Sequence, residues 1–456
     1  MPSKGKVRKI GPYTITQTLG RGGMGTVYCV VIPATGKTAA LKQLNPAELL
    51  VDLLGPDTVR EIFYAEAKIM ARLQHPNIVK AWDIEPEGDQ PYFTMEYFCN
   101  NIGMMIGEQF TLEQTTRIIR PEKAVAYANQ VLDGLQYIHA SGIIHRDIKP
   151  YNLLVTDHDI VKICDFGMSK HQLIQSFGSD GLNIGSPYYT APEQNRTPDL
   201  ADQRSDLYSV GVLLYRMLTG ELPGMKSFPL SRINPLYDHA WDDFFTKSLS
   251  WNPDMRHQDA GEMTAALLKL ELHWEKQKKK LCHMKGDESA TRTTVSGLRS
   301  SPFRVSGSNA KKLFMVNDLW QPNSYSANRF TDGEEGTILD KATGLHWQQT
   351  GSDYPVDREE ADIIIEALNA IRHGGLSTWR IPTVNELLTL VKDPALSHED
   401  CTTLPFSDNL DWSWSCDRRS EKTSWYVNTG LGYVGWQDDG CRYSIRAVSS
   451  SENSSI

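Results

Sequence analysis

The stretch His145-Arg-Asp-Ile-Lys-Pro-Tyr-Asn152, followed by Asp165-Phe-Gly167, decides the fold of this chain. Asp147 is suited to accept the proton of an attacking hydroxyl, and Lys149 to steady a transferring phosphoryl group. Asn152 and the aspartate of the second motif carry the oxygen ligands that Mg²⁺ prefers. Phosphoryl transfer needs a metal clamp, a cationic clamp and a base near the acceptor, so the two motifs together favour that chemistry.

A glycine-rich turn, Gly20-Arg-Gly-Gly-Met-Gly25, lies between two expected strands at 13–19 and 25–32. Glycines let a backbone turn sharply and lay its amides against phosphate without an intervening side chain. The pattern alone is weak, because a dinucleotide-binding fold would place a helix rather than a strand after it. Lys42, on a third expected strand at 39–44, can reach the same phosphates, although a surface lysine is the commoner interpretation of any single strand lysine.

An acidic partner for Lys42 is expected on the helix predicted over 57–74. Glu66 is the candidate and Glu61 its rival, and without Lys42 a solvated helix glutamate would be the favoured interpretation. Ala191-Pro-Glu193 then follows Asp165 by 28 residues. Each motif alone can arise by chance, but the glycine-rich turn, the strand lysine, the 145–152 and 165–167 motifs and the 191–193 motif do not occur by chance in this order and with these spacings.

These motifs resemble the eukaryotic-type Ser/Thr protein kinase family of bacteria, over residues 13–270. The resemblance implies an α+β fold, the bilobal protein kinase fold with a β-rich N-terminal lobe and an α-rich C-terminal lobe. It implies a signalling transferase that uses ATP and Mg²⁺, phosphorylates Ser/Thr hydroxyls of proteins and phosphorylates itself. The alternative is a pseudokinase scaffold that works through its C-terminal domain, and transfer to a small molecule is disfavoured by the segment 185–193.

The resemblance also assigns site residues. The catalytic residues are Asp147, Lys149, Lys42 and Glu66. The ATP-binding residues are Leu19, Gly20, Gly22, Gly25, Val27, Ala40, Lys42, Met95 (the gatekeeper), Glu96, Phe98 and Leu154. The metal ligands are Asn152 and Asp165, the activation-loop residues are Ser176, Ser179 and Ser186, and the structural residues are Asp206, Glu193 and Arg256.

Activation is less clearly encoded. Ser186 replaces the usual threonine but keeps its hydroxyl, and Arg146 beside the base favours activation by a phosphate on the loop, with Ser176 and Ser179 as candidates. No threonine lies between Asp165 and Ser186. Constitutive activity, or activation by association as a homodimer, therefore stays open.

Composition divides the chain into parts. The net charge is −9, yet residues 276–312 contain ten Lys or Arg against two Asp or Glu, and seven of the 11 tryptophans follow residue 319. We expect a kinase domain at 10–273, a basic Ser/Thr-rich linker at 274–312, a third domain at 313–450 and a tail at 451–456. The linker is expected to be a solvated spacer, with autophosphorylation or contact with an anionic membrane as alternatives.

The third domain has its own landmarks, Arg329-Phe-Thr-Asp332, the segments 338–347 and 379–387, and Tyr443-Ser-Ile-Arg-Ala-Val448. They resemble the Lcl C-terminal family, which is similar to C-type lectins and formylglycine-generating enzymes. This implies a smaller mixed α/β domain with helices at 358–372 and after Pro382. The predicted core residues are Trp347, Trp379 and Pro382, and the predicted binding surface for an unknown ligand or protein is Trp425, Tyr433 and Trp436.

The remaining expectations are about compartment and partners. No two of the seven cysteines form a CxxC pair, which excludes a zinc ribbon or redox pair written in that form. A Cys416–Cys441 bridge is expected only in an oxidising compartment. The acidic balance disfavours nucleic acid as a partner, and no apolar run approaches ~18 residues. We therefore expect a cytoplasmic protein without a transmembrane segment.

Overall fold

The computed structural model describes residues 8–88, 90–109, 114–167, 169–171, 188–224, 229–234, 236–284, 298–333, 335–392, 406 and 411–450. The chain divides into two compact units, residues 1–271 and 272–456. Each unit is described by itself below. Among the described residues, no helix combines the length and the apolar content needed to cross a bilayer.

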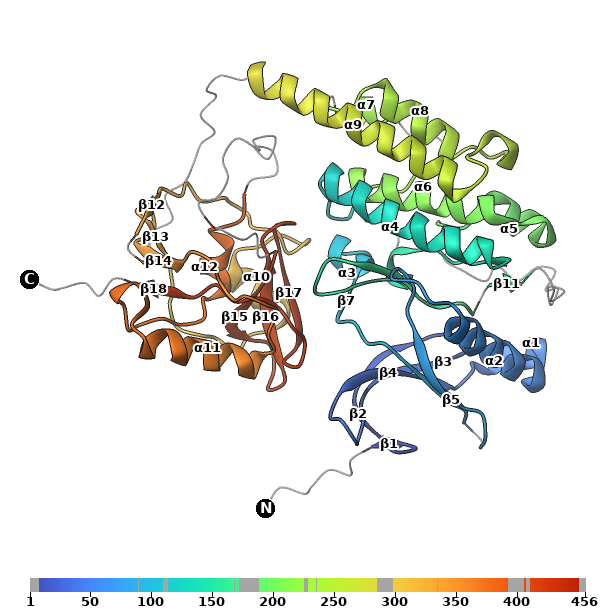
Figure 1. Cartoon of the computed structure of the whole chain (residues 1–456), viewed down its shortest axis with the longest axis horizontal. Coiled ribbons are helices and arrows are strands. Elements are labelled where there is room, and N and C mark those ends of the chain that lie inside the picture. The colour runs from blue at the N-terminus through green and yellow to red at the C-terminus, as the bar shows by residue number, and fades with distance from the viewer. Residues whose placement is uncertain are drawn as a thin grey trace, which may run out of the picture. The chain divides into compact units, whose positions relative to one another are not determined.

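The first unit begins with a six-stranded antiparallel sheet in the order β1-β2-β3-β4-β6-β5 (Figure 1). Its strands are β1 (Lys9–Ile10), β2 (Tyr13–Arg21), β3 (Gly25–Val31), β4 (Thr38–Leu44), β5 (Ala81–Glu85) and β6 (Tyr92–Met95). The three strands predicted from the glycine-rich region coincide with β2, β3 and β4. Two helices, α1 (Glu48–Leu54) and α2 (Pro56–Arg72), follow β4, and Pro56 at the first position of α2 is favourable because its missing N–H needs no partner there.

A helical lobe follows, with α4 (Pro121–Ala140) and α6 (Gln203–Thr219) at its centre (Figure 1). The predicted apolar face of α4 is buried: Val125, Ala128, Val131, Leu135 and Ile138 are each at most 1% exposed. The other helices are α3 (Ile102–Ile106), α5 (Pro192–Arg196), α7 (Leu230–Ile233), α8 (His239–Ser248) and α9 (Ala260–Met284). Two small sheets complete the lobe, formed by β7 (Asn100–Asn101), β9 (Leu153–Val155) and β10 (Val161–Ile163), and by β8 (Ile143–Ile144) and β11 (Lys170–His171). The predicted order, β-rich then α-rich, is confirmed.

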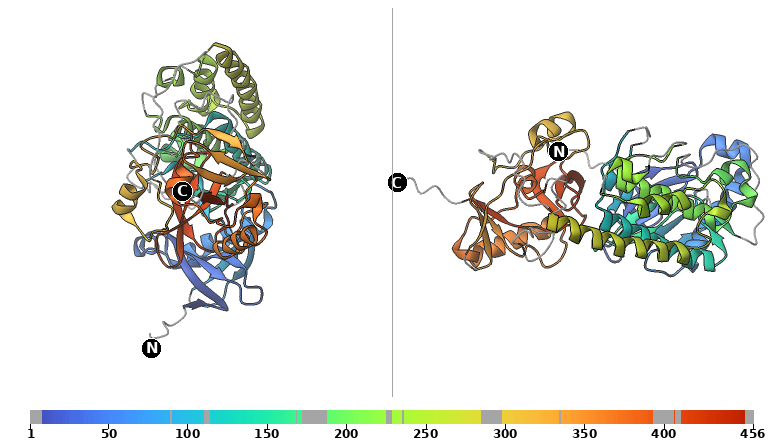
Figure 2. Two further views of the ribbon diagram at one scale, coloured as in Figure 1. Left: turned by 90° about the vertical axis from the view of Figure 1, so that its left-hand side faces the viewer. Right: turned by 90° about the horizontal axis from the view of Figure 1, so that it is seen from above.

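The second unit is mixed α/β, as predicted (Figure 2). One antiparallel sheet contains β12 (Phe330–Asp332), β13 (Thr337–Asp340), β14 (Leu345–Gln348) and β18 (Val448–Ser450), and another contains β15 (Trp412–Arg418), β16 (Thr423–Asn428) and β17 (Tyr433–Asp438). The helices are α10 (Gly307–Phe314), α11 (Arg358–Ala370) and α12 (Val384–Leu388). Trp347 and Trp379 are buried, which confirms the two predicted core tryptophans.

The predicted aromatic binding surface is wrong for two of its three residues. Trp425 and Tyr433 are 1% and 2% exposed. The Trp425 ring packs edge-on against Phe314, and its indole N–H donates to the carbonyl of Val305, so it is a core side chain. Only Trp436 is half-buried, and the Arg419 guanidinium lies 3.7 Å from its ring centroid.

The predicted linker is structured at both described ends. Helix α9 continues past residue 274 to Met284, and α10 occupies 307–314. Arg299 donates to Asp417 Oδ1 at 2.7 Å and to Asn385 at 2.8 Å, which ties residues 298–305 to the second unit. Only residues 285–297 of the linker lie outside the described residues.

The Cys416–Cys441 bridge is not formed, because Cys416 is a free cysteine. Its thiol lies in β15 next to Asp417 and near Glu386, and burial together with these carboxylates raises its pKa to about 12. A thiol so rarely ionised is a poor partner for disulfide exchange.

Candidate active site

The centre of the site is a buried cation between two carboxylates. Lys42 projects from β4, the strand between β3 and β6, and its Nζ lies 2.6 Å from Glu66 Oε1 on α2 and 3.1 Å from Asp165 Oδ1. Burial alone would lower the pKa of Lys42, but the Glu66 and Asp165 carboxylates outweigh it and raise this pKa. The same ammonium holds the pKa of Asp165 well below its usual range. Lys42 and Asp165 are therefore both charged at neutral pH.

The rival glutamate, Glu61, is not part of this pair: it is exposed, whereas Glu66 is 2% exposed. Residues Val59, Phe63, Glu66, Ala67 and Met70 form the buried face of α2. Glu66 thus lies on the face that packs inward, where burial raises the pKa of its carboxyl to about 7 and the Lys42 ammonium opposes that rise.

The segment between β8 and β9 brings three polar side chains together. Lys149 Nζ lies 2.7 Å from Asp147 Oδ2, and the Asn152 amide donates to the same oxygen at 2.9 Å and to the Asp147 carbonyl at 2.8 Å. Asp147 is 9% exposed. Burial raises the pKa of its carboxyl, and the neighbouring Lys149 opposes that rise. A raised pKa brings this carboxylate closer to the range useful for a general base.

Asp206, in the first turn of α6, binds the backbone of this segment through its carboxylate. Its fully buried carboxylate accepts from the backbone N–H groups of His145 at 2.9 Å and Arg146 at 2.7 Å, and His139 Nε2 lies 2.8 Å away. Arg146 has a φ of 69°, a left-handed conformation that costs a non-glycine residue free energy. The hydrogen bond from its N–H to Asp206 stabilises that conformation.

The Asp165-Phe166-Gly167 turn points its aspartate at Lys42. Asp165 also has a left-handed φ, 65°, and Phe166 is buried with its ring 4.8 Å from His145 in an edge-on contact. A Cβ on Gly167 would lie 3.3 Å from Asp165 Oδ1 and 3.4 Å from Glu66 Oε2, so a larger residue would crowd the ion pair. Cys164 is a free thiol whose pKa is raised by burial, as expected of a small residue without a redox role.

The glycine-rich turn connects β2 to β3, and its glycines differ in purpose. A Cβ on Gly25 would lie 2.3 Å from the carbonyl oxygen of Gln43, so packing against β4 requires glycine there. A Cβ on Gly20 or Gly22 would meet nothing within 4 Å. Those two glycines leave their backbone open to an approaching group, which is what a phosphate-binding loop needs.

The predicted adenine-side residues lie on strands β2, β3, β4, β6 and β9 and in the segment that follows β6. Val27 pairs with Lys42 across β3 and β4, and Ala40 pairs with Met95 across β4 and β6. The Glu96 carboxylate forms an ion pair with Lys162 at 3.2 Å and accepts a hydrogen bond from the backbone N–H of Lys80. The backbone of Glu96 is therefore the part of this residue that is available to a nucleotide base. The other predicted members, Leu19, Phe98 and Leu154, are exposed or half-buried, and Lys162 lies 5.5 Å from the Phe98 ring.

Glu193 and Arg256 form the expected structural pair. Arg256 donates from both terminal nitrogens to the two Glu193 oxygens, at 2.7 and 2.8 Å, and its side chain is fully buried. Ser205 donates to Glu193 as well. The activation-loop serines, Ser176, Ser179 and Ser186, lie outside the described residues.

Two supporting residues were not foreseen from the sequence. His139 contacts Asp206, and Gln194 donates from its side chain to the Arg146 carbonyl at 3.0 Å. His139 lies on the last turn of α4, where a histidine is also expected for its favourable interaction with the helix dipole. No sequence pattern separates that role from contact with a distant aspartate.

The oxygen ligands present fit Mg²⁺. Asp165 offers a carboxylate with 44% of its side chain exposed, and Asn152 offers an amide oxygen while its amide N–H group is held by Asp147. Mg²⁺ is commonly held by one or two protein oxygens together with substrate phosphates. Among the described residues, no cluster of three or more His, Cys, Asp or Glu suits a more heavily ligated metal.

Two protein families and several curated proteins are similar to parts of this chain. The family model described as "Protein kinase domain" matches residues 13–284, and the one described as "Lcl C-terminal domain" matches residues 336–449. A probable serine/threonine-protein kinase of Clostridium perfringens is 31% identical over 273 residues, covering 57% of this chain and 38% of that protein. Serine/threonine-protein kinase PknB of Mycolicibacterium smegmatis is 32% identical over 278 residues, covering 57% of this chain and 43% of that protein. The crystal structure of the Mycobacterium tuberculosis PknI kinase domain is similar with a TM-score of 0.46 at 25% identity, covering 58% of this chain and 98% of that one. The chain therefore spans about two fifths of the length of the curated relatives it matches.

Proposed function

Because the chain belongs to the protein kinase domain family over residues 13–284, we propose that it is an ATP-dependent serine/threonine protein kinase. The observation that supports this most is the convergence of five charged residues from four separate segments of the chain. Lys42 and Glu66 meet Asp165, while Asp147 pairs with Lys149 in the neighbouring segment, whose backbone N–H group at Arg146 donates to Asp206. The bacterial relatives named as Ser/Thr kinases support the same acceptor class.

In the proposed reaction each residue has one role. Asp147 orients the acceptor hydroxyl and takes its proton, and its raised pKa suits this task. Lys149 stabilises charge on the transferring group, and Lys42 positions the phosphates of ATP while Glu66 fixes its ammonium. Mg²⁺, held by Asn152 and Asp165, would neutralise charge on the phosphate oxygens. The open backbone at Gly20 and Gly22 would accept the phosphates.

The finer parts of the proposal concern regulation and partners. The kinase phosphorylates itself, with Ser176 and Ser179 as activation-loop candidates, and the Lcl C-terminal-like domain recruits a protein or ligand. Support comes from Arg146, whose half-buried side chain donates to the Pro198 carbonyl at 2.7 Å, close to the end of the activation segment. A phosphate on that segment would find a cation there.

The test is phosphate transfer by the purified full chain with Mg-ATP and a Ser/Thr-containing protein substrate. Asp147→Asn keeps the shape of the base but removes its negative charge, so we expect transfer to fall at least about 10²-fold while nucleotide affinity stays within about twofold. Asp254→Asn, at an exposed carboxylate on the same lobe, is the matched control and should keep full activity. Transfer by Asp147→Asn at the native rate would contradict the assignment.

A further inference from the structure

Helix α1 (Glu48–Leu54) presents an apolar surface that the described residues of the chain leave exposed. Its sequence, Glu-Leu-Leu-Val-Asp-Leu-Leu, contains five large aliphatic residues, yet none of its residues is buried. Leu49 and Leu53, one helical turn apart, are 69% and 50% exposed. Adjacent exposed leucines on a short helix are costly in water, and such patches with a polar rim mark interaction sites.

The rim of this patch is acidic. Glu48 and Asp52 are exposed and share the one-turn spacing of the two leucines, so the acidic row runs alongside the leucine row. Helix α1 contains no basic residue, and neither carboxylate forms an ion pair with any residue in the described part of the chain. A partner that fits here is apolar at its centre and basic at its rim.

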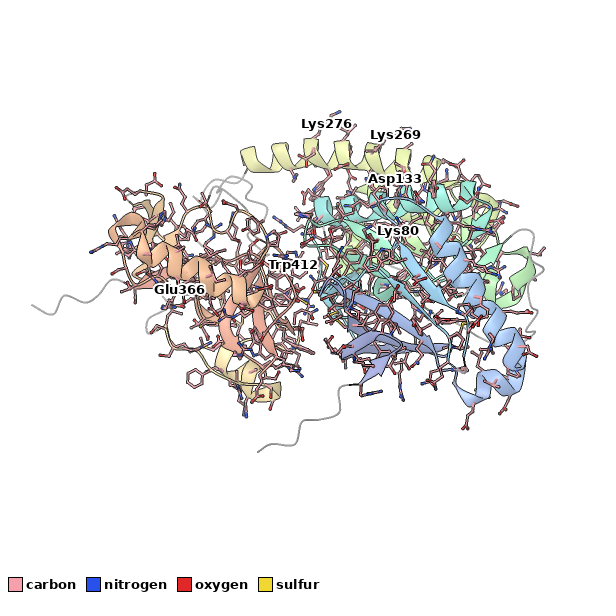
Figure 3. All side chains as sticks on the ribbon, turned by 60° about the horizontal axis from the view of Figure 1, so that its bottom comes forward. Lys80, Asp133, Lys269, Lys276, Glu366 and Trp412 are labelled. Carbon is pink, nitrogen blue, oxygen red and sulfur yellow. The ribbon has the colours of Figure 1, made fainter. Side chains whose placement is uncertain are left out.

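A surface of that description exists on α9 of this same chain. Leu268 and Leu272, again one turn apart, are 49% and 64% exposed. Lys276 continues their row by one more turn, Lys269 lies on one side of the row, and Glu271 and Glu275, three residues after each leucine, lie on its other side. Both lysines are exposed, are unpaired with the residues that the structure describes, and lie on the outer side of α9 in Figure 3.

We propose that α1 of one copy docks on α9 of a second copy, leucine pair against leucine pair and acidic rim against basic rim. The two leucine pairs match in spacing and are both exposed, and the lysine side of the α9 row is opposite in charge to the acidic row of α1. A contact within one copy does not serve, since Figures 1 and 2 place α1 and the first half of α9 on different lobes of the first unit. Pairing α1 with α1 would bring acid against acid.

This contact is heterologous, because it joins two different surfaces, and so it leaves one unused α1 and one unused α9 at the ends of each assembly. Its position also matters for the site. Gly55 alone separates α1 from α2, the helix that carries Glu66, so the docked copy lies next to the element that completes the Lys42 ion pair. The proposal concerns association only, and it stands or fails independently of phosphate transfer.

The experiment measures self-association of the full chain by sedimentation, from about 1 to about 100 µM, a range that brackets micromolar dissociation constants. Reversing the acidic rim (Glu48→Lys with Asp52→Lys) or the basic rim (Lys269→Glu with Lys276→Glu) should weaken association at least about tenfold. Mixing the two reversed proteins should restore it, because each reversed α1 then meets a reversed α9 of opposite charge. All four positions are exposed, so circular dichroism and thermal unfolding should stay as in the wild type.

The leucines are tested in the same way. Leu49→Ser with Leu53→Ser and, separately, Leu268→Ser with Leu272→Ser should each weaken association about tenfold or more. The control is Ile363→Ser with Ile371→Ser on the second unit, two exposed isoleucines (59% and 71%) that lie outside both patches, and it should change nothing. A wild type that stays monomeric throughout, single reversals without effect, or a mixture that fails to regain association would each overturn the proposal.

Discussion

Asp206 is the residue whose replacement tests the architecture of the site most sharply, and the change is Asp206→Asn. The carboxylate is fully buried and accepts on both oxygens: Arg146 N–H binds Oδ1, while His145 N–H and His139 meet Oδ2. An asparagine has one acceptor oxygen and one NH₂ group. In either orientation at least one backbone N–H therefore faces a donor instead of an acceptor.

The magnitude follows from these contacts. Losing a hydrogen bond to a charged group costs about 1.5–3 kcal/mol, and the stranded buried donor adds about 1–3 kcal/mol. We expect Asp206→Asn to lower the free energy of unfolding of the first unit by about 3–5 kcal/mol. It should also lower phosphate transfer, because the left-handed Arg146 beside Asp147 loses the bond that holds it.

The assay is urea unfolding of the full chain, followed by circular dichroism and tryptophan fluorescence. Seven of the 11 tryptophans follow residue 319, so fluorescence reports mainly on the second unit and supplies an internal reference. Two units are expected to give two unfolding transitions, and only the midpoint of the first unit's transition should shift. The matched control, Asp254→Asn, removes an exposed pair with Arg204 and should change stability by less than about 1 kcal/mol. An Asp206→Asn midpoint equal to that of the wild type would refute the reasoning.

Three further changes have distinct expected results. Lys42→Met should abolish transfer and also remove the cause of the low Asp165 pKa. A carboxyl whose pKa is depressed in the folded state stabilises that state above the unfolded pKa of about 4, and this stabilisation is lost as the pH falls through the folded pKa. The stability difference between the variant and the wild type at pH 7 should therefore shrink near pH 3 in acid-unfolding curves. Gly25→Ala should destabilise the first unit by about 1–3 kcal/mol, because its Cβ meets the Gln43 carbonyl. Gly22→Ala should unfold as the wild type does but raise the KM for ATP, and equal unfolding midpoints for the two variants would count against this distinction. Arg299→Ala should destabilise the second unit by about 3–5 kcal/mol, because it leaves the buried Asp417 carboxylate without its cation. Arg304→Ala, at an exposed ion pair, should cost less than about 1 kcal/mol in the same urea titration. The same midpoint for both variants would contradict a structural role of Arg299.

Much of the first unit could be predicted because short sequence motifs identify its candidate site residues. Local chemistry identifies Lys42, Asp147 and Asp165, and strand periodicity places the first of these on the correct element. The choice of Glu66 over Glu61 needed only the helical repeat and the position of Lys42. Contacts such as His139 with Asp206 join residues 67 positions apart, and no local pattern indicates them.

The second unit was harder for a physical reason. Trp425 and Tyr433 lie among glycine and aspartate, which is typical of a surface, but β16 and β17 turn these rings into the core. Alternation in a strand shows that two faces exist without showing which one is buried. The basic composition of 276–312 likewise hid Arg299, whose buried partner Asp417 lies 118 residues away.

The most direct test of the proposed kinase activity is phosphoamino-acid analysis after incubation of the full chain with Mg-ATP and a protein substrate. We predict phosphoserine and phosphothreonine, no phosphotyrosine, and no label above background with either Asp147→Asn or Lys42→Met. Phosphate on tyrosine alone, or equal labelling by the two variants and the wild type, would contradict it.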